Sequence, residues 1–343
     1  MNKIRILSTE KLTNRLPDKV NDIDYYQLDK TSTIQHMITI FRLLLKIRRY
    51  DVLLVFNADA DAMLVAFLNR FILHSKTKVV FYDLNLHSPD NFKSKLFCMI
   101  KKILLSGVDN FLCMHKDMSS YQKYYNITEA KCTYIPFKAN NYNILSKFVP
   151  KDGIYILSCG ASYRDFNTLI EAITELDYPC KIVLPPENAA KSHNTHLEEK
   201  NLPKNVEIIR HDFDNNSWNR YIAEARLVVI PIQKRALQPA GISVYLEAMA
   251  LGKPVIISEG TSTRGIITNN EAEIVPCEDS HSLASAIKKI WEDKEYRECL
   301  ANNGKKYALS LEGEERLVKD ILQEICFFLE RKGNKETKLL PNA

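Results

Sequence analysis

The chain has 343 residues, of which 45% are apolar and 26% are charged, the composition of an ordinary soluble globular protein. This length is too great for a typical single core and suits two domains. No apolar run reaches 18 residues, which excludes a transmembrane helix, and the apolar stretch at the start is too short for a secretory signal. We therefore expect a cytoplasmic protein.

Charge is distributed unevenly. Residues 1–150 carry 22 basic and 13 acidic side chains, a balance of +9, and the remainder carries 25 and 29, a balance of −4. The basic first half predicts an anionic partner, either a membrane surface or a phosphate-bearing acceptor. No nucleic-acid motif is visible, so no nucleic acid is expected. The eight cysteines form no C-x-x-C pair, which predicts reduced structural cysteines and no zinc site.

The first half alternates short apolar runs with amphipathic segments. Runs rich in Val, Ile, Leu or Phe are typical of buried parallel strands. The predicted strands span residues 4–7, 52–56, 78–82, 110–113 and 132–136, and the predicted helices span 33–48, 61–73 and 93–105.

The helix at 93–105 has two interpretations. Its apolar stripe consists of Leu96, Met99, Ile100, Ile103 and Leu104, and it is flanked by Lys93, Lys95, Lys101 and Lys102. Either the stripe packs on the core and the lysines are solvated, or the helix faces an anionic membrane. Arg42, Lys46, Arg48 and Arg49 add to the basic side of the same half.

The periodic signal stops at residues 138–153, a polar stretch with Pro150 and Gly153 that we interpret as a linker. A second alternating series follows. Its predicted strands are 154–158, 181–184, 206–210, 227–231 and 254–258, and its predicted helices are 166–175, 217–224, 243–251, 280–292, 294–308 and 314–331. The predicted divisions are 1–145, 146–312, a C-terminal helix at 313–332 and a polar tail at 333–343.

Two successive series of this kind predict an α/β protein with two doubly wound, Rossmann-like domains and a cleft between them. Ligands of such sheets bind beyond the carboxyl ends of the strands, so residues just after strands are the candidates. Only Gly107 of the ten glycines precedes residue 150. Neither G-x-G-x-x-G nor a Walker A sequence is present, which argues against a nicotinamide dehydrogenase and a P-loop kinase.

Gly160 ends the first strand of the second series, in LSCGASYRDFNTLIEA, and Arg164 follows just before a helix. A glycine there lets the backbone turn tightly and approach a ligand. A guanidinium there can hold phosphate oxygens in a fork geometry. The alternative is a turn glycine and a solvated arginine.

The segment 228–260 reads VVIPIQKRALQPAGISVYLEAMALGKPVIISEG. Basic Lys234 and Arg235 follow an apolar strand, and Gly241, Ile242 and Ser243 lead into a helix. The free N–H groups and positive dipole end at that helix start suit a diphosphate. Ser243 could instead cap the helix. Glu247 lies among apolar neighbours and needs a partner, which ribose hydroxyls would supply, or it faces solvent.

The stretch YLEAMALGKPVI resembles the donor-site segment of retaining GT-B glycosyltransferases of family 4. The resemblance implies that Glu247 is the second glutamate of a Glu-x7-Glu motif and holds the nucleotide ribose. It also matches Gly160 to the family's glycine and Arg164 to its diphosphate-binding lysine. It covers most of 151–310 and implies two facing domains of GT-B architecture, with a nucleotide-diphosphate sugar as the donor.

Two positions depart from that pattern. Pro239 stands where the first glutamate, which contacts the transferred sugar, is found in the family, and Ala161 stands where the family has its first arginine. Lys234 and Arg235 are predicted to replace the lost cation. A non-catalytic GT-B subunit that binds a partner or a glycan is the alternative function.

The first domain is predicted to bind the acceptor. Its third strand ends in FYDLNLHSPD, which places Asp83 and His87 at the cleft edge as candidate catalytic groups. We therefore predict a glycosyltransferase that acts on a glycan, a lipid-linked or a surface acceptor, with retained configuration. No cofactor and no metal are expected, and the protein is expected in the cytoplasm, with peripheral attachment to the inner membrane face as a further expectation.

Overall fold

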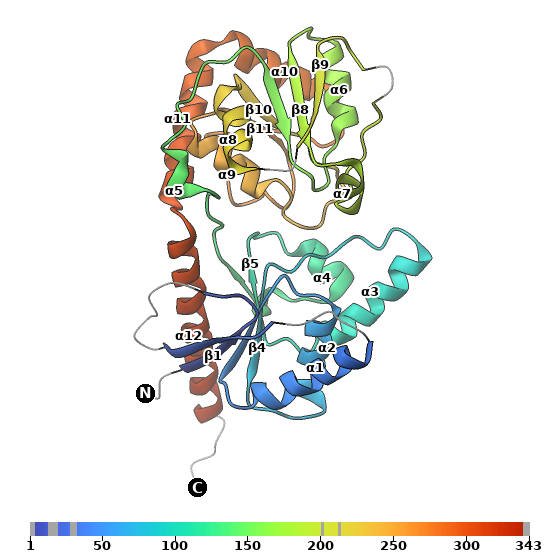
Figure 1. The fold of residues 1–343 in the computed structure, drawn as a ribbon, viewed down its shortest axis with the longest axis vertical. Helices are drawn as coiled ribbons and strands as arrows, with labels where there is room; N and C mark the ends of the chain where they lie inside the picture. The colour runs from blue at the N-terminus through green and yellow to red at the C-terminus, as the bar shows by residue number, and fades with distance from the viewer. Residues whose placement is uncertain (1–3, 13–19, 28–32, 200–201, 212–213, 339–343) are drawn as a thin grey trace. The chain divides into compact units, whose positions relative to one another are not determined.

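The computed structural model describes residues 4–12, 20–27, 33–199, 202–211 and 214–338. The chain divides into two compact units (Figure 1). Unit 1 comprises Met1–Met114, Met118–Ile135 and Leu317–Ala343, and unit 2 comprises His115–Asp117 and Pro136–Arg316.

The sheet of unit 1 has six parallel strands in the order β2-β1-β3-β4-β5-β6. They are β1 (Ile4–Ser8), β2 (Val20–Tyr25), β3 (Val52–Phe56), β4 (Lys78–Tyr82), β5 (Asn110–Cys113) and β6 (Cys132–Tyr134). Its helices are α1 (Thr33–Ile47), α2 (Ala60–Phe71), α3 (Phe92–Leu105), α4 (Ser119–Tyr125) and α12 (Glu314–Lys338). In Figure 1, α12 lies on one side of this sheet and α1, α2 and α3 lie on the other.

Local sequence explains where these elements begin. Helix α2 starts because the Asp59 side chain accepts a hydrogen bond from the amide of Ala62. Helix α3 starts with a reciprocal capping box between Asn91 and Ser94. Strand β3 is an unbroken apolar run whose first four residues are buried, as a central parallel strand requires.

The sheet of unit 2 is also parallel, in the order β12-β11-β10-β7-β8-β9. Its strands are β7 (Ile156–Cys159), β8 (Cys180–Leu184), β9 (Val206–Arg210), β10 (Leu227–Ile230), β11 (Val255–Ser258) and β12 (Glu273–Val275). The helices are α5 (Tyr142–Leu145), α6 (Phe166–Thr174), α7 (Glu187–Ser192), α8 (Asn215–Glu224), α9 (Ile242–Ala250), α10 (Ser280–Glu292) and α11 (Lys294–Ser310). The order reverses between β7 and β10, which is the switch point where doubly wound sheets bind ligands.

The division between the units differs from the predicted boundary at 145/146. The guanidinium of Arg316 donates to the carbonyls of Pro136 and Phe137, each at 2.8 Å, and Lys138 forms an ion pair of 3.0 Å with Glu314. These contacts join residues 136–145 to unit 2. The predicted C-terminal helix begins at Glu314 and continues to Lys338, so it includes the start of the predicted tail; residues 339–343 lie outside the described residues.

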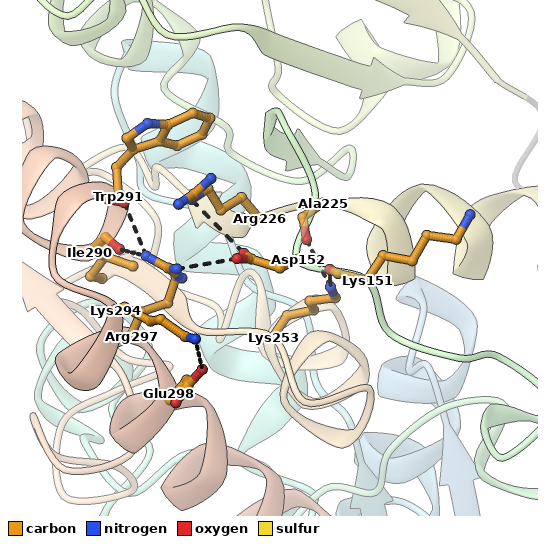
Figure 2. A network of polar contacts seen from close by, with 10 residues as sticks. All are labelled: Lys151, Asp152, Ala225, Arg226, Lys253, Ile290, Trp291, Lys294, Arg297 and Glu298. Carbon is orange, nitrogen blue, oxygen red and sulfur yellow. Dashed lines mark hydrogen bonds and ion pairs between the residues drawn. The ribbon is translucent and has the colours of Figure 1, made fainter.

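The end of the predicted linker is anchored by a polar network in which Lys253 and Arg297 are buried (Figure 2). The ammonium of Lys253 donates to the carbonyls of Lys151 and Ala225, the second at 2.8 Å. The Asp152 carboxylate accepts a 3.3 Å hydrogen bond from the buried Arg297. Residues 151–152 are therefore fixed beside the amino ends of β10 and β11, and the stretch 138–153 is part of unit 2.

Candidate functional site

A cavity of about 490 Å³ in unit 2 is lined by residues that follow β7 and by the start of α9. Five predicted site residues line it together: Gly160, Arg164, Gly241, Ser243 and Glu247. The lining also includes Lys138, Asn140, Asn141, Ala161, Ser162, Asn215, Trp218 and Val244. The cavity therefore lies where the sheet order predicts a ligand site.

Arg164 is buried in the wall of this cavity, with 2% of its surface exposed. Its Nε donates to the carbonyl of Cys159 at 2.9 Å and its Nη1 donates to the carbonyl of Ser162 at 2.8 Å. Burial lowers the pKa of Arg164 to about 10, which still leaves it charged at neutral pH. Among the described residues no carboxylate forms an ion pair with it. The solvated arginine considered above is therefore wrong, and this buried cation suits an anion.

Gly160 provides the space for that guanidinium. Its φ of +111° lies in the region that favours glycine, and a Cβ at this position would lie 2.2 Å from Nη2 of Arg164. The position of the Arg164 guanidinium therefore requires a glycine at 160, because any larger residue there would collide with it.

Helix α9 begins directly after Gly241, which has a φ of +91°. Among the described residues no side chain caps this helix, so the capping role considered for Ser243 is not observed. The first amide N–H groups of an uncapped helix are available to an anion. Ile242 is buried and does not line the cavity.

Glu247 is one turn further along α9, with 4% of its surface exposed. Its Oε2 accepts a hydrogen bond of 2.7 Å from Nε1 of Trp218. Burial raises the pKa of Glu247 to about 7, while hydrogen bonds from Trp218 and Asn140 and the charge of Lys138 act to lower it. The solvent-facing alternative for Glu247 is wrong. A carboxylate in a cavity wall can accept further hydrogen bonds from hydroxyl groups.

Lys234 and Arg235 are exposed and lie outside the cavity lining. The Nε of Arg235 donates to the side chain of Gln233 at 2.8 Å, and its guanidinium lies 5.9 Å from the ring centroid of Tyr163. Lys138, in the stretch interpreted as a linker, is a cation that lines the cavity.

Asp83 and His87 follow β4 in unit 1. Asp83 has a φ of +56°, and burial, followed by the charge of Glu10, raises its pKa to about 6. His87 is exposed; partial burial of its ring and the charge of Lys101 lower its pKa. A carboxyl group with a pKa near neutrality can exchange a proton at physiological pH.

Sequence reasoning missed the second half of the cavity wall. Asn140 and Asn141 lie in the stretch interpreted as a linker, and the strand before them, β6, belongs to the other sheet, so no local signal marks them. Asn215 and Trp218 lie at the start of α8, and no local signal marks them. Among the described residues, no group of three or more His, Cys, Asp or Glu could hold a metal ion.

Residues 146–307 match the family model of glycosyl transferases group 1. No curated protein matches the chain in sequence. Among solved structures, Alr3699/HepE of Anabaena in complex with UDP is 15% identical, with a TM-score of 0.66 over 96% of this chain and 100% of that one. A sucrose-phosphate synthase of Thermosynechococcus elongatus is 17% identical, with a TM-score of 0.65 over 90% and 84%.

A glycosyltransferase of Rickettsia africae is 14% identical, with a TM-score of 0.65 over 96% and 99% of the two chains. These likenesses show the fold, two Rossmann-like units of the GT-B type, and the family match covers the cavity residues from Gly160 to Glu247. The chain therefore carries a group 1 glycosyltransferase domain in residues 146–307.

Proposed function

We propose that the cavity of unit 2 binds a UDP-sugar and that the protein transfers the sugar to an acceptor. The observation that carries the proposal is that one cavity combines a buried cation, Arg164, an uncapped helix start at Gly241 and a buried carboxylate, Glu247. Arg164 and the amide groups at the helix start can bind the diphosphate, and the carboxylate of Glu247 can accept hydrogen bonds from the ribose diol. Similar Anabaena HepE structures contain UDP and UDP-glucose, which supports uracil as the base.

In the proposed reaction, the bond between the sugar C1 and the diphosphate oxygen breaks, and the acceptor oxygen bonds to C1 on the same face. The leaving phosphate takes the acceptor proton, so no strong side-chain base is required. Arg164 and the first amides of α9 stabilise the negative charge that develops on the diphosphate, which is usually the largest catalytic effect. Lys138, Lys234 and Arg235 are the further cations proposed for this charge.

The acceptor is proposed to be a glycan, a lipid-linked sugar or a surface acceptor that meets unit 1, with Asp83 and His87 beside it. The protein is proposed to act in the cytoplasm at the membrane surface. The part of the chain that the structure describes contains no candidate membrane-spanning helix.

Pro239 and Ala161 favour one alternative, a non-catalytic subunit that keeps the nucleotide site. Donor hydrolysis with a panel of UDP- and GDP-sugars separates the two. A UDP-sugar hydrolysed by the wild type and not by Glu247→Ala supports the enzyme. Nucleotide binding without hydrolysis of any sugar, and without transfer to glycan acceptors, supports the subunit.

A further inference from the structure

The outer surface of α1 and α3 in unit 1 is apolar, and none of the described residues covers it. Helix α2 packs between α1 and α3, so the three form one layer on the side of the sheet opposite α12 (Figure 1). We call the exposed surface of this layer the α1–α3 face. Its exposed apolar residues are Met37, Ile38, Phe41 and Leu45 on α1, Phe71 and Ile72 at the end of α2, and Phe92, Leu96, Phe97, Met99, Ile100 and Ile103 on α3.

This surface contradicts the core-packed interpretation of the helix at 93–105. Only Cys98 and Leu105 of α3 are buried, whereas Phe92 is 86% exposed and Met99 is 64% exposed. Single exposed apolar residues are common in soluble proteins, but a group of this number on one layer of helices is typical of an interaction surface. Four of the five residues of the predicted stripe therefore point away from the sheet; the fifth, Leu104, is half-buried.

The charges on the same helices have a single sign. Neither α1 nor α3 contains an aspartate or a glutamate. Helix α3 carries Lys93, Lys95, Lys101 and Lys102, and α1 carries Arg42 and Lys46. The ammonium of Lys93 lies 6.0 Å from the ring centroid of Phe97, so the cationic and apolar side chains are interleaved.

We propose that the α1–α3 face docks on the surface of an anionic lipid bilayer, with its apolar side chains among the acyl chains and its lysines at the headgroups. Interfacial helices combine an apolar face with flanking lysines in this way, and long basic side chains keep their charge in the headgroup layer. A second copy of the chain fits poorly, because two such faces would bring like charges together. The docking does not depend on the proposed function. Only the further step, that the docked protein acts on an acceptor in the membrane, rests on it.

Cosedimentation with vesicles tests the docking. The wild type is expected to bind vesicles that contain phosphatidylglycerol at low salt, to bind phosphatidylcholine vesicles weakly, and to be released as salt shortens the screening length. The quadruple variant Lys93→Gln, Lys95→Gln, Lys101→Gln, Lys102→Gln is expected to bind about 600-fold more weakly, because each of the four lysines near an anionic surface contributes about a fivefold change. The matched control replaces four exposed lysines of α10 and α11, at 288, 294, 305 and 306, with glutamine and should bind as the wild type does.

Insertion of the apolar side chains needs its own measurement. Phe92→Trp introduces an indole at the most exposed apolar position, and the two natural tryptophans, Trp218 and Trp291, both belong to unit 2. Vesicles should shift the added emission to the blue, and lipids brominated on the acyl chain should quench it. Leu309→Trp, at an exposed position of α11, is the control and should show neither change.

Donor binding is measured on the same preparations by calorimetry with UDP-glucose, so the two proposals fail separately. A wild type that binds UDP-glucose but ignores anionic vesicles at low salt overturns the docking and leaves the proposed function standing. Vesicle binding by the quadruple variant at wild-type strength also overturns it. A third result would overturn the docking. In it, light scattering shows that the wild type is a stable dimer and that the double variant Phe92→Ser, Met99→Ser is a monomer.

Discussion

The indole Nε1 of Trp218 donates a 2.7 Å hydrogen bond to Oε2 of Glu247, and both side chains are almost fully buried in the wall of one cavity. The two residues are 29 positions apart and come from α8 and α9. This bond and a hydrogen bond from the side chain of Asn140 orient the carboxylate. The lone pairs of Glu247 that remain can accept from another donor, which the proposed function identifies as the ribose.

Replacing Trp218 with phenylalanine should therefore weaken donor binding while keeping most of the ring's packing. A hydrogen bond to a charged group contributes about 1.5–3 kcal/mol, so we expect the Kd for UDP-glucose to rise tenfold or more, by about that free energy. Calorimetry measures it. Trp291→Phe is the control, because Trp291 stacks on Tyr178 outside the cavity. An unchanged Kd in Trp218→Phe would show that the bond serves the fold alone.

Donor binding should depend on pH through Glu247. Its pKa of about 7 means that the carboxyl group is mostly protonated at pH 6, whereas ribose hydroxyls bind best to the ionised form. Affinity should therefore rise about tenfold between pH 6 and pH 8, with release of a proton on binding below pH 7. UDP-glucose is the ligand to use, because its diphosphate does not titrate there. Glu247→Gln should bind more weakly and with a flat profile; a wild-type profile in this variant would contradict the assignment.

Gly160→Ala should displace the Arg164 guanidinium, because the added Cβ would lie 2.2 Å from Nη2 in a backbone conformation that alanine rarely adopts. We expect a loss of about 2 kcal/mol or more in the free energy of unfolding and a large fall in UDP affinity. Urea denaturation and calorimetry measure the two. Gly260→Ala is the matched control, since nothing lies within 4 Å of a Cβ there. Equal behaviour of the two variants would remove Gly160 from the site.

Lys138→Met should weaken UDP binding and reduce its dependence on salt, because the variant removes a cation from the cavity lining. We expect a change of about tenfold. Glu314→Gln breaks the ion pair with Lys138 but keeps the cation, so it controls for the lost pair. The double variant Lys234→Ser, Arg235→Ser should have a smaller effect, since both side chains lie outside the lining. A larger effect in the double variant would move the cationic role to that loop.

The central strands could be predicted from the sequence because burial on both faces imposes an unbroken apolar run. Strands β3, β4 and β5 begin and end where predicted. Strands β2 and β12 were not predicted. Each lies at an edge of its sheet, and an edge strand such as Val20–Tyr25 alternates with polar residues and carries no such run.

The residues of the candidate site also fall into those that a local sequence pattern predicts and those that it does not. Gly160, Gly241 and Glu247 follow from a strand–turn–helix pattern that is local in sequence. The contact of Glu247 with Trp218 is long-range, so no spacing rule could show it. The exposed stripe of α3 shows a further limit: helical periodicity gives a shared face but does not say whether that face meets a sheet or a different surface.

Helix α12 gives unit 1 a discontinuous chain. Its buried residues Leu317, Val318, Ile321, Leu322 and Ile325 belong to unit 1, yet they follow the whole of unit 2 in sequence. During synthesis, residues 136–316 leave the ribosome before this helix exists, so unit 2 can complete its core first. One side of the sheet of unit 1 stays uncovered until α12 is synthesised, so unit 1 completes its fold after unit 2. This order is the reverse of the usual one during translation, and it leaves the uncovered sheet accessible to chaperones.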